Sequence, residues 1–247
     1  PAALPAVLEM IEFNGDKDPV LRHAGVMALL GTATEQELAD LVRHDSEAIR
    51  HAAVITLRRM GSPKVISFLG DTNLKISNDA IRAIHDTHIE QARPVVTALL
   101  DDPSLGTRQR PLTRMILRRL IHSAYRIPNE QNLTRLLKAA VNPLFPIEER
   151  KEAMRLLAMW ENPHEVDQSL GYHSPLPPRD PAIMQKVLRE DIGLLLSGGP
   201  AIFGDAMKLA LKYGIEHEGL DSGSLTRIIR DSKTDGETRA SALDLFL

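Results

Sequence analysis

The sequence Asp18-Pro19-Val20-Leu21-Arg22-His23-Ala24 returns twice in altered form further along the chain. The related stretches run from Asp45 to Ala52 and from Asp71 to Ala80, and Arg50 follows Arg22 by 28 positions. After each stretch, apolar residues continue at spacings of three and four, which places them on one face of a helix. A repeating helical unit of about 28 residues is therefore predicted.

A shorter apolar segment lies between successive helices and begins near a proline, at Pro5, Pro63 and Pro94. Proline suits the first turn of a helix, because the N–H that it lacks would be unpaired there. We expect the aspartate that opens each long helix to be its N-cap. Two helices of about ten residues and two short turns fit the period, so each unit is predicted to be an antiparallel pair stacked on its neighbours.

The pattern becomes looser after residue 100. The predicted fold is an all-α, right-handed solenoid of about six helix pairs. We expect regular repeats over 1–127 and irregular repeats over 128–247, with a proline-rich loop at 161–180, in one continuous solenoid. The later helices are expected over 108–126, 129–141, 147–160, 181–196, 201–213, 221–232 and 235–247.

The composition excludes several classes of site. Cysteine is absent, which rules out disulfides, thiolate metal sites and CxxCH haem attachment in these residues. Lys and Arg number 30 against 33 Asp and Glu, so the net charge of -3 does not favour nucleic acid. No apolar run has the roughly 20 residues of a membrane span. The chain starts at Pro1 and stops within an amphipathic pattern, so we expect a processed or excised piece.

A stripe of basic residues is predicted on the helix over 108–126. Its members are four positions apart: Arg110, Arg114, Arg118, His122 and Arg126. Like charges at this spacing repel, so a partner must offset the repulsion. One interpretation is a ridge for an acidic protein partner or a polyanion. The other is pairing with acids of adjacent helices. The scarcity of aromatic residues argues against nucleic acid.

The loop over 161–180 is the second candidate site. The run from His173 to Arg179 holds three prolines and favours an extended backbone. Two interpretations remain open: a rigid strap across the edge of the solenoid, or a docking segment for a neighbouring domain with Tyr172 and Leu176 as anchors.

Catalytic and metal signals are weak. No G-x-S-x-G, P-loop or G-x-G-x-x-G motif is present. His85 and His88 form an H-x-x-H without a third ligand at a recognisable spacing. The adjacent acids Glu148-Glu149 and Glu190-Asp191 are interpreted as solvated. We therefore expect no catalytic residue, no metal and no cofactor in this chain.

The Asp-Pro-x-Val/Leu-Arg-x-x-Ala stretches resemble HEAT repeats of the short, bilin-lyase-like kind. Longer sequence segments resemble the middle section of planctomycete and verrucomicrobial membrane-bound dehydrogenases. These segments are Arg58–Pro63, Ala80–Asp86, Ile89–Pro94 and Leu176–Pro181, and the last follows a helix that contains Trp160. In that family a β-propeller precedes the HEAT section and a cytochrome c domain follows it. The resemblance implies an exported spacer that lacks both activities.

The expected function is a non-catalytic scaffold for protein partners or flanking domains, without nucleic-acid binding or membrane insertion. Two alternatives remain. The chain could be a free-standing adaptor that binds peptides on its concave face. It could instead be a lyase-like component acting on tetrapyrrole proteins, as the short-repeat resemblance implies. A flanking CxxCH would favour the spacer, and binding of bilin or haem would favour the lyase-like role.

Overall fold

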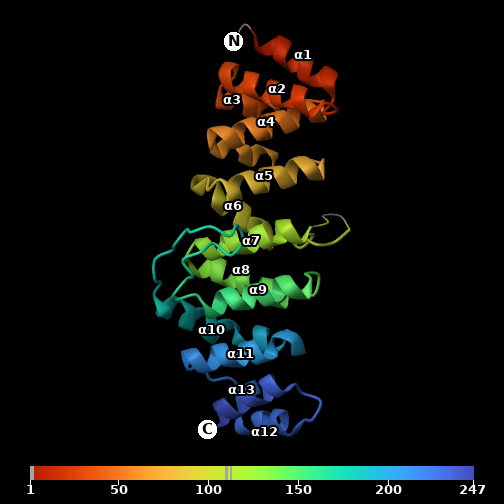
Figure 1. Ribbon diagram of the computed structural model, residues 1–247. Coiled ribbons are helices and arrows are strands. Elements are labelled where there is room, and N and C mark those ends of the chain that lie inside the picture. The colour runs from red at the N-terminus through yellow and green to blue at the C-terminus, as the bar shows by residue number, and fades with distance from the viewer. Residues whose placement is uncertain (1–2, 109–110, 112) are drawn as a thin grey trace. The chain divides into compact units, whose positions relative to one another are not determined.

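The computed structural model describes residues 3–108, 111 and 113–247, and within them regular structure is helical (Figure 1). An isolated bridge pairs Val166 with His173. The prediction of an all-α fold of stacked helices is confirmed. The chain divides into two compact units, the first ending at Ala98 and the second beginning at Leu99.

The first unit alternates long helices with short ones. Its elements are α1 (Leu4–Asn14), α2 (Pro19–Thr32), α3 (Glu35–Asp40), η1 (Leu41–Arg43), α4 (Glu47–Met60), η2 (Pro63–Phe68), α5 (Leu74–Asp86), η3 (Glu90–Ala92) and α6 (Arg93–Ala98). The long helices α2, α4 and α5 pack in succession, and α3, η2 and η3 form a second row. Apolar residues such as Leu29, Ile49 and Ile84 are buried between the rows.

The expectation of two helices of about ten residues per repeat is wrong. The long helix α4 takes 14 residues and α5 takes 13, whereas α3, the 3₁₀ helix η2 and α6 have six each. A long first helix leaves room for only one or two turns of the second within the period. Proline begins η2 at Pro63 and is the second residue of α6 at Pro94, whereas α3 begins at Glu35 without one.

The expected aspartate caps form only in part. Asp18 caps α2 by accepting the backbone N–H of Val20 at 2.7 Å. The N-cap positions of α4 and α5 are instead held by Ser46 and Asn73. Asp71 accepts hydrogen bonds of 2.8 and 3.2 Å from the guanidinium of Arg50. That aspartate therefore links two repeats through a charge-assisted pair.

The second unit has longer partner helices. Its elements are η4 (Leu99–Asp101), α7 (Arg114–Arg126), α8 (Glu130–Val141), α9 (Ile147–Ala158), α10 (Pro181–Leu196), α11 (Pro200–Tyr213), η5 (Glu218–Leu220), α12 (Ser222–Arg230) and α13 (Gly236–Phe246). One row consists of α7, α9, α11 and α13, each packed on the next. Helices α8 and α10 pack together on the other side, and α12 packs on α13.

The helix expected over 108–126 begins later, at Arg114. The hydroxyl of Thr113 accepts the backbone N–H of Ile116 at 3.3 Å and caps the helix there. Arg108 precedes the helix and is in a bend, and the predicted stripe member Arg110 lies outside the described residues. The stripe on α7 therefore comprises Arg114, Arg118, His122 and Arg126.

Candidate partner-binding site

The basic stripe of α7 runs from an exposed end to a buried one. The side chains of Arg114 and Arg118 are 63% and 41% exposed, whereas those of His122 and Arg126 are 4% and 11% exposed. The stripe faces α9 and the loop between α9 and α10. Its two exposed arginines are the members that a protein partner could reach.

Acids on α9 pair with the stripe. Glu149 is buried and accepts Nε of Arg114 at 3.0 and 3.2 Å. Glu152, one turn further on, accepts Nε2 of His122 at 2.6 Å and lies 3.3 Å from Arg118. The interpretation of the Glu148-Glu149 pair as solvated is therefore wrong for Glu149. These contacts offset the repulsion along α7, as the pairing interpretation expected.

Glu152 is the centre of this network. It also accepts two hydrogen bonds from Arg155, at 2.8 and 2.6 Å. Burial raises the pKa of Glu152, but the hydrogen bonds and charges of His122 and Arg155 outweigh burial and hold the pKa far below its ordinary value. The carboxylate therefore stays ionised and binds α7 to α9 across the physiological pH range.

Arg126, at the buried end of the stripe, and the more exposed Arg118 hold the loop between α9 and α10. Arg126 donates to Asp167 and to the hydroxyl of Ser174, both at 3.0 Å. Arg118 donates to the backbone oxygen of Gln168 at 2.9 Å. Asp167 in turn accepts the backbone N–H of Ser169 at 2.8 Å, which shapes the turn.

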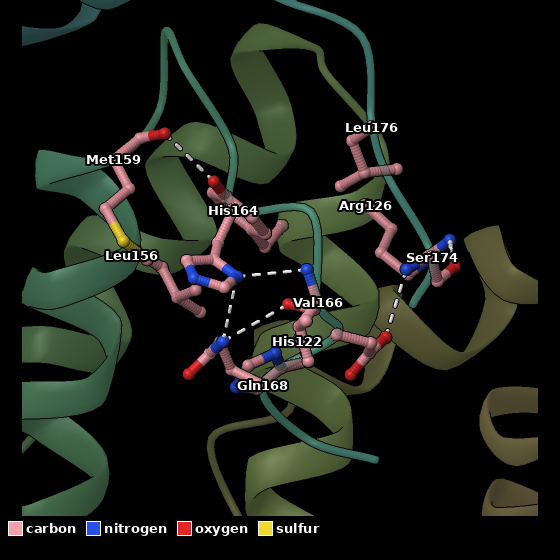
Figure 2. Close-up of a pocket in the computed structure, with 11 residues that line it drawn as sticks. His122, Arg126, Leu156, Met159, His164, Val166, Gln168, Ser174 and Leu176 are labelled. Atoms are coloured by element: carbon pink, nitrogen blue, oxygen red, sulfur yellow. Dashed lines mark hydrogen bonds and ion pairs between the residues drawn. The ribbon is translucent and has the colours of Figure 1, made fainter. Parts of the chain in front are cut away.

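A small cavity lies where the loop meets α7 and α9 (Figure 2). Its volume of about 20 Å³ is enough for roughly one water molecule. Leu176 lines it and is half-buried, whereas Tyr172 is exposed to 41%. His164 lies at the opposite wall, and its Nδ1 accepts the backbone N–H of Val166 at 2.9 Å. Of the two predicted anchors, Leu176 faces the second unit itself and Tyr172 faces outward.

Arg179 anchors the far end of the loop, and the sequence analysis did not single it out. Its guanidinium lies 4.2 Å from the ring centroids of both Tyr125 and Trp160. It donates to the backbone oxygen of Tyr125 at 2.6 Å. Burial lowers the pKa of Arg179 to about 10. The stacking and the hydrogen bond support the interpretation of this loop as a strap across the second unit.

The first unit contains a related network. His51 is buried on α4, and its Nε2 lies 2.9 Å from Asp79 on α5. Its Nδ1 lies 3.4 Å from Asp16, which also binds Lys75 at 2.6 Å. Within the described ranges, no three His, Asp or Glu residues are grouped as metal ligands. His85 is buried in α5, and Nδ1 of His88 lies 3.3 Å from Arg93.

The rows of stacked helices in each unit are the architecture of a helical-repeat protein. In both units, buried side chains pair with acids of the next repeat. More particularly, residues 4–84 match the family model for HEAT repeats, which covers most of the first unit. No curated protein sequence matches the chain. Among the described residues, every helix is too short or too polar to cross a lipid bilayer.

Proposed function

We propose that this chain is a non-catalytic scaffold that holds protein partners or flanking domains. HEAT repeats generally serve as protein–protein scaffolds, and a stack of repeats presents long surfaces for such contacts. The observation that carries the proposal is the exposure gradient along the α7 stripe. All four members bind α9 or the loop, but Arg114 and Arg118 also keep partly exposed side chains that are held on a rigid support.

Arg114, Arg118 and Tyr172 are proposed to touch the partner directly. His122, Arg126 and Leu176 are proposed to position them. His122 binds α9, Arg126 binds the loop, and Leu176 of the loop lines the cavity against α7 and α9. An acidic partner surface would match the arginines, and Tyr172 would supply apolar contact area. Exposed residues of this kind contribute to binding without being needed for the core.

Cross-linking of the native protein in its source cells, followed by mass spectrometry, tests the scaffold proposal. We expect reproducible cross-links from the loop over 161–180 to one partner or flanking domain. Replacing Arg114 and Arg118 with Ser should remove that contact. Cross-links that persist unchanged in a folded variant would contradict the assignment of these arginines. Absence of any reproducible protein partner would contradict the scaffold function.

The finer proposal is that the chain is the spacer of a larger exported redox protein, placed between a propeller dehydrogenase and a cytochrome c domain. Its support is the resemblance of Arg58–Pro63 and Leu176–Pro181 to that protein family. The intact mass and a covalent-haem stain of the native polypeptide test it. A chain several times 27.4 kDa that carries haem is expected. A haem-free chain near that mass would contradict the spacer and favour a free-standing adaptor.

A further inference from the structure

Tyr125 on α7 and Trp160, which follows α9, form two adjoining walls around a cation in the second unit. Their rings lie 6.1 Å apart at an angle of 73°, and the guanidinium of Arg179 lies 4.2 Å from both ring centroids. The hydroxyl of Tyr125 donates to the backbone oxygen of Met159 at 3.0 Å, directly before Trp160. The two rings are therefore held together by contacts that do not involve Arg179, and we name them the aromatic cage.

Arg179 occupies the aromatic cage without a carboxylate partner. Its side chain is buried, and no acid among the described residues forms an ion pair with it. In the same part of the chain, Nη1 of Arg179 and Nε1 of Trp160 are buried and have no hydrogen-bond acceptor. Arg126, by contrast, pairs with Asp167. Buried donors without acceptors are costly, so Arg179 is stacked on the rings but its charge is poorly compensated.

The strap, which is the loop over 161–180, is only lightly tied to the helices next to Arg179. Three of the four residues between Ser174 and Arg179 are prolines, which have no N–H. These four residues make no hydrogen bond within the described chain. On the other side, Asp180 caps α10 by accepting the backbone N–H of Ala182 at 2.9 Å. Rotation of the Arg179 side chain would therefore empty the aromatic cage without loss of that cap.

We propose that the aromatic cage is a binding site for an arginine side chain of a partner protein, and that Arg179 fills it in the free chain as a built-in competitor. This inference rests on the proposed scaffold function and names a contact apart from the exposed arginines of α7. A partner arginine would repeat both stacking contacts, which suit a planar guanidinium. A carboxylate beside that arginine would also accept the N–H groups that stay unpaired in the free chain, and this favours the exchange.

The strap competes for the aromatic cage because it is tethered. A tethered segment has an effective concentration in the millimolar range, so a free peptide exchanges poorly with Arg179. A partner that is already bound to the scaffold is tethered in the same sense, and its arginine competes on similar terms. Removal of the Arg179 side chain should therefore make the cage accessible to a free peptide.

The test offers the aromatic cage a copy of its own occupant. The peptide has the sequence of Ser174–Asp180 with blocked ends, and the full chain carries Arg179→Ala. Trp160 is the only tryptophan of the chain, so its fluorescence reports binding at the cage. The matched control is Arg189→Ala, which removes an exposed arginine of α10 and leaves Arg179 in place. A second peptide has alanine at the position of the arginine.

We expect Arg179→Ala to bind the arginine peptide about tenfold more tightly than the wild type and Arg189→Ala do. The alanine peptide should bind to Arg179→Ala about tenfold more weakly than the arginine peptide. No saturable change in Trp160 fluorescence would overturn the proposal, as would equal binding of the two peptides or equal binding by the three chains. If circular dichroism shows that Arg179→Ala is unfolded, Arg179→Lys replaces it, because lysine has no guanidinium plane to stack on the rings.

Native complexes separate the aromatic cage from the scaffold function. We expect Arg179→Ala to form the native partner complex about tenfold more tightly than Arg189→Ala, because the built-in competitor is gone. Equal tightness, or a native complex together with no peptide binding, would overturn the cage and leave the scaffold standing. Failure of the wild-type chain to form any native complex would overturn both proposals.

Discussion

Nε2 of His122 on α7 lies 2.6 Å from Oε1 of Glu152 on α9, 30 positions further along the chain. The first unit has the same relationship between His51 and Asp79, which lie 2.9 Å apart and 28 positions apart. Both spacings are about one repeat. In each unit a buried imidazole thus binds one long helix to the next, and we name this pair the His–acid clamp.

Glu152 is predicted to be the most sensitive residue of the clamp in the second unit. Glu152→Ala should lower the free energy of unfolding by about 3 kcal/mol, since removing one member of a buried ion pair leaves the other unpaired. Glu148→Ala is the matched control, because Glu148 is exposed on the same helix. Glu148→Ala should change the free energy of unfolding by less than about 0.5 kcal/mol. Urea unfolding followed by circular dichroism measures both, and equal effects would contradict the clamp.

Acid should weaken both clamps. For Asp79, burial raises the pKa, but the hydrogen bond and charge of His51 outweigh burial, so the net pKa is lowered. The pKa of Glu152 is lowered in the same way by His122 and Arg155. Groups with depressed pKa values stabilise the fold above their unfolded pKa values of 3.8 and 4.5, and this stability is lost as the pH falls below them. We expect the melting temperature to fall steeply below about pH 4, and less steeply in Glu152→Gln.

Arg179 is predicted to hold the strap by stacking. Arg179→Ala should expose the loop over 161–180 and raise its cleavage rate by subtilisin about tenfold, since both aromatic contacts and the hydrogen bond to Tyr125 are lost. Arg179→Met keeps an unbranched apolar side chain between the rings and should restore most of the protection. Unchanged cleavage in Arg179→Ala would show that the loop is held elsewhere.

Substitutions of Tyr172 and Leu176 should distinguish the loop's contribution to stability from its contribution to partner binding. Leu176→Ala is expected to lower the free energy of unfolding by about 1 kcal/mol, because this half-buried side chain lines the cavity. Tyr172→Ala should leave stability within about 0.5 kcal/mol and weaken partner binding. The melting temperature and co-purification of the partner are the two measurements. A destabilised Tyr172→Ala with intact partner binding would contradict the outward role.

Two glycines of α2 should respond in opposite directions to alanine. A Cβ at Gly25 would lie 2.5 Å from Cγ1 of Ile11 on α1, so Gly25→Ala should force the helices apart and destabilise the first unit by about 1–3 kcal/mol. Gly31 has open space around it, and Gly31→Ala should stabilise by up to about 1 kcal/mol through helix propensity. Thermal unfolding of both variants checks the packing of α1 on α2, and a stabilising Gly25→Ala would contradict it.

Sequence patterns predicted helices well where the signals are local. The helix over 181–196 is found with the predicted bounds, because Asp180 caps it and Pro181 occupies its first turn. The resemblance of the Asp-Pro-x-Val/Leu-Arg-x-x-Ala stretches to HEAT repeats is confirmed by the family match over residues 4–84. By contrast, the start of α7 was placed six residues too early, since Thr113 and the preceding turns, rather than the run of arginines, set its beginning.

Composition and periodicity by themselves determined an all-α stack of repeats, because capping and apolar spacing act within one turn of helix. Only the tertiary structure decided what the polar residues do. Glu149 meets Arg114 across 35 positions, and Arg179 meets Tyr125 across 54. The packing of one repeat on another determines which side chains become partners. A charge pattern along a single helix therefore does not predict these pairs. The physical reason is that burial and pairing depend on the neighbouring surface, which exists only after the repeats have stacked.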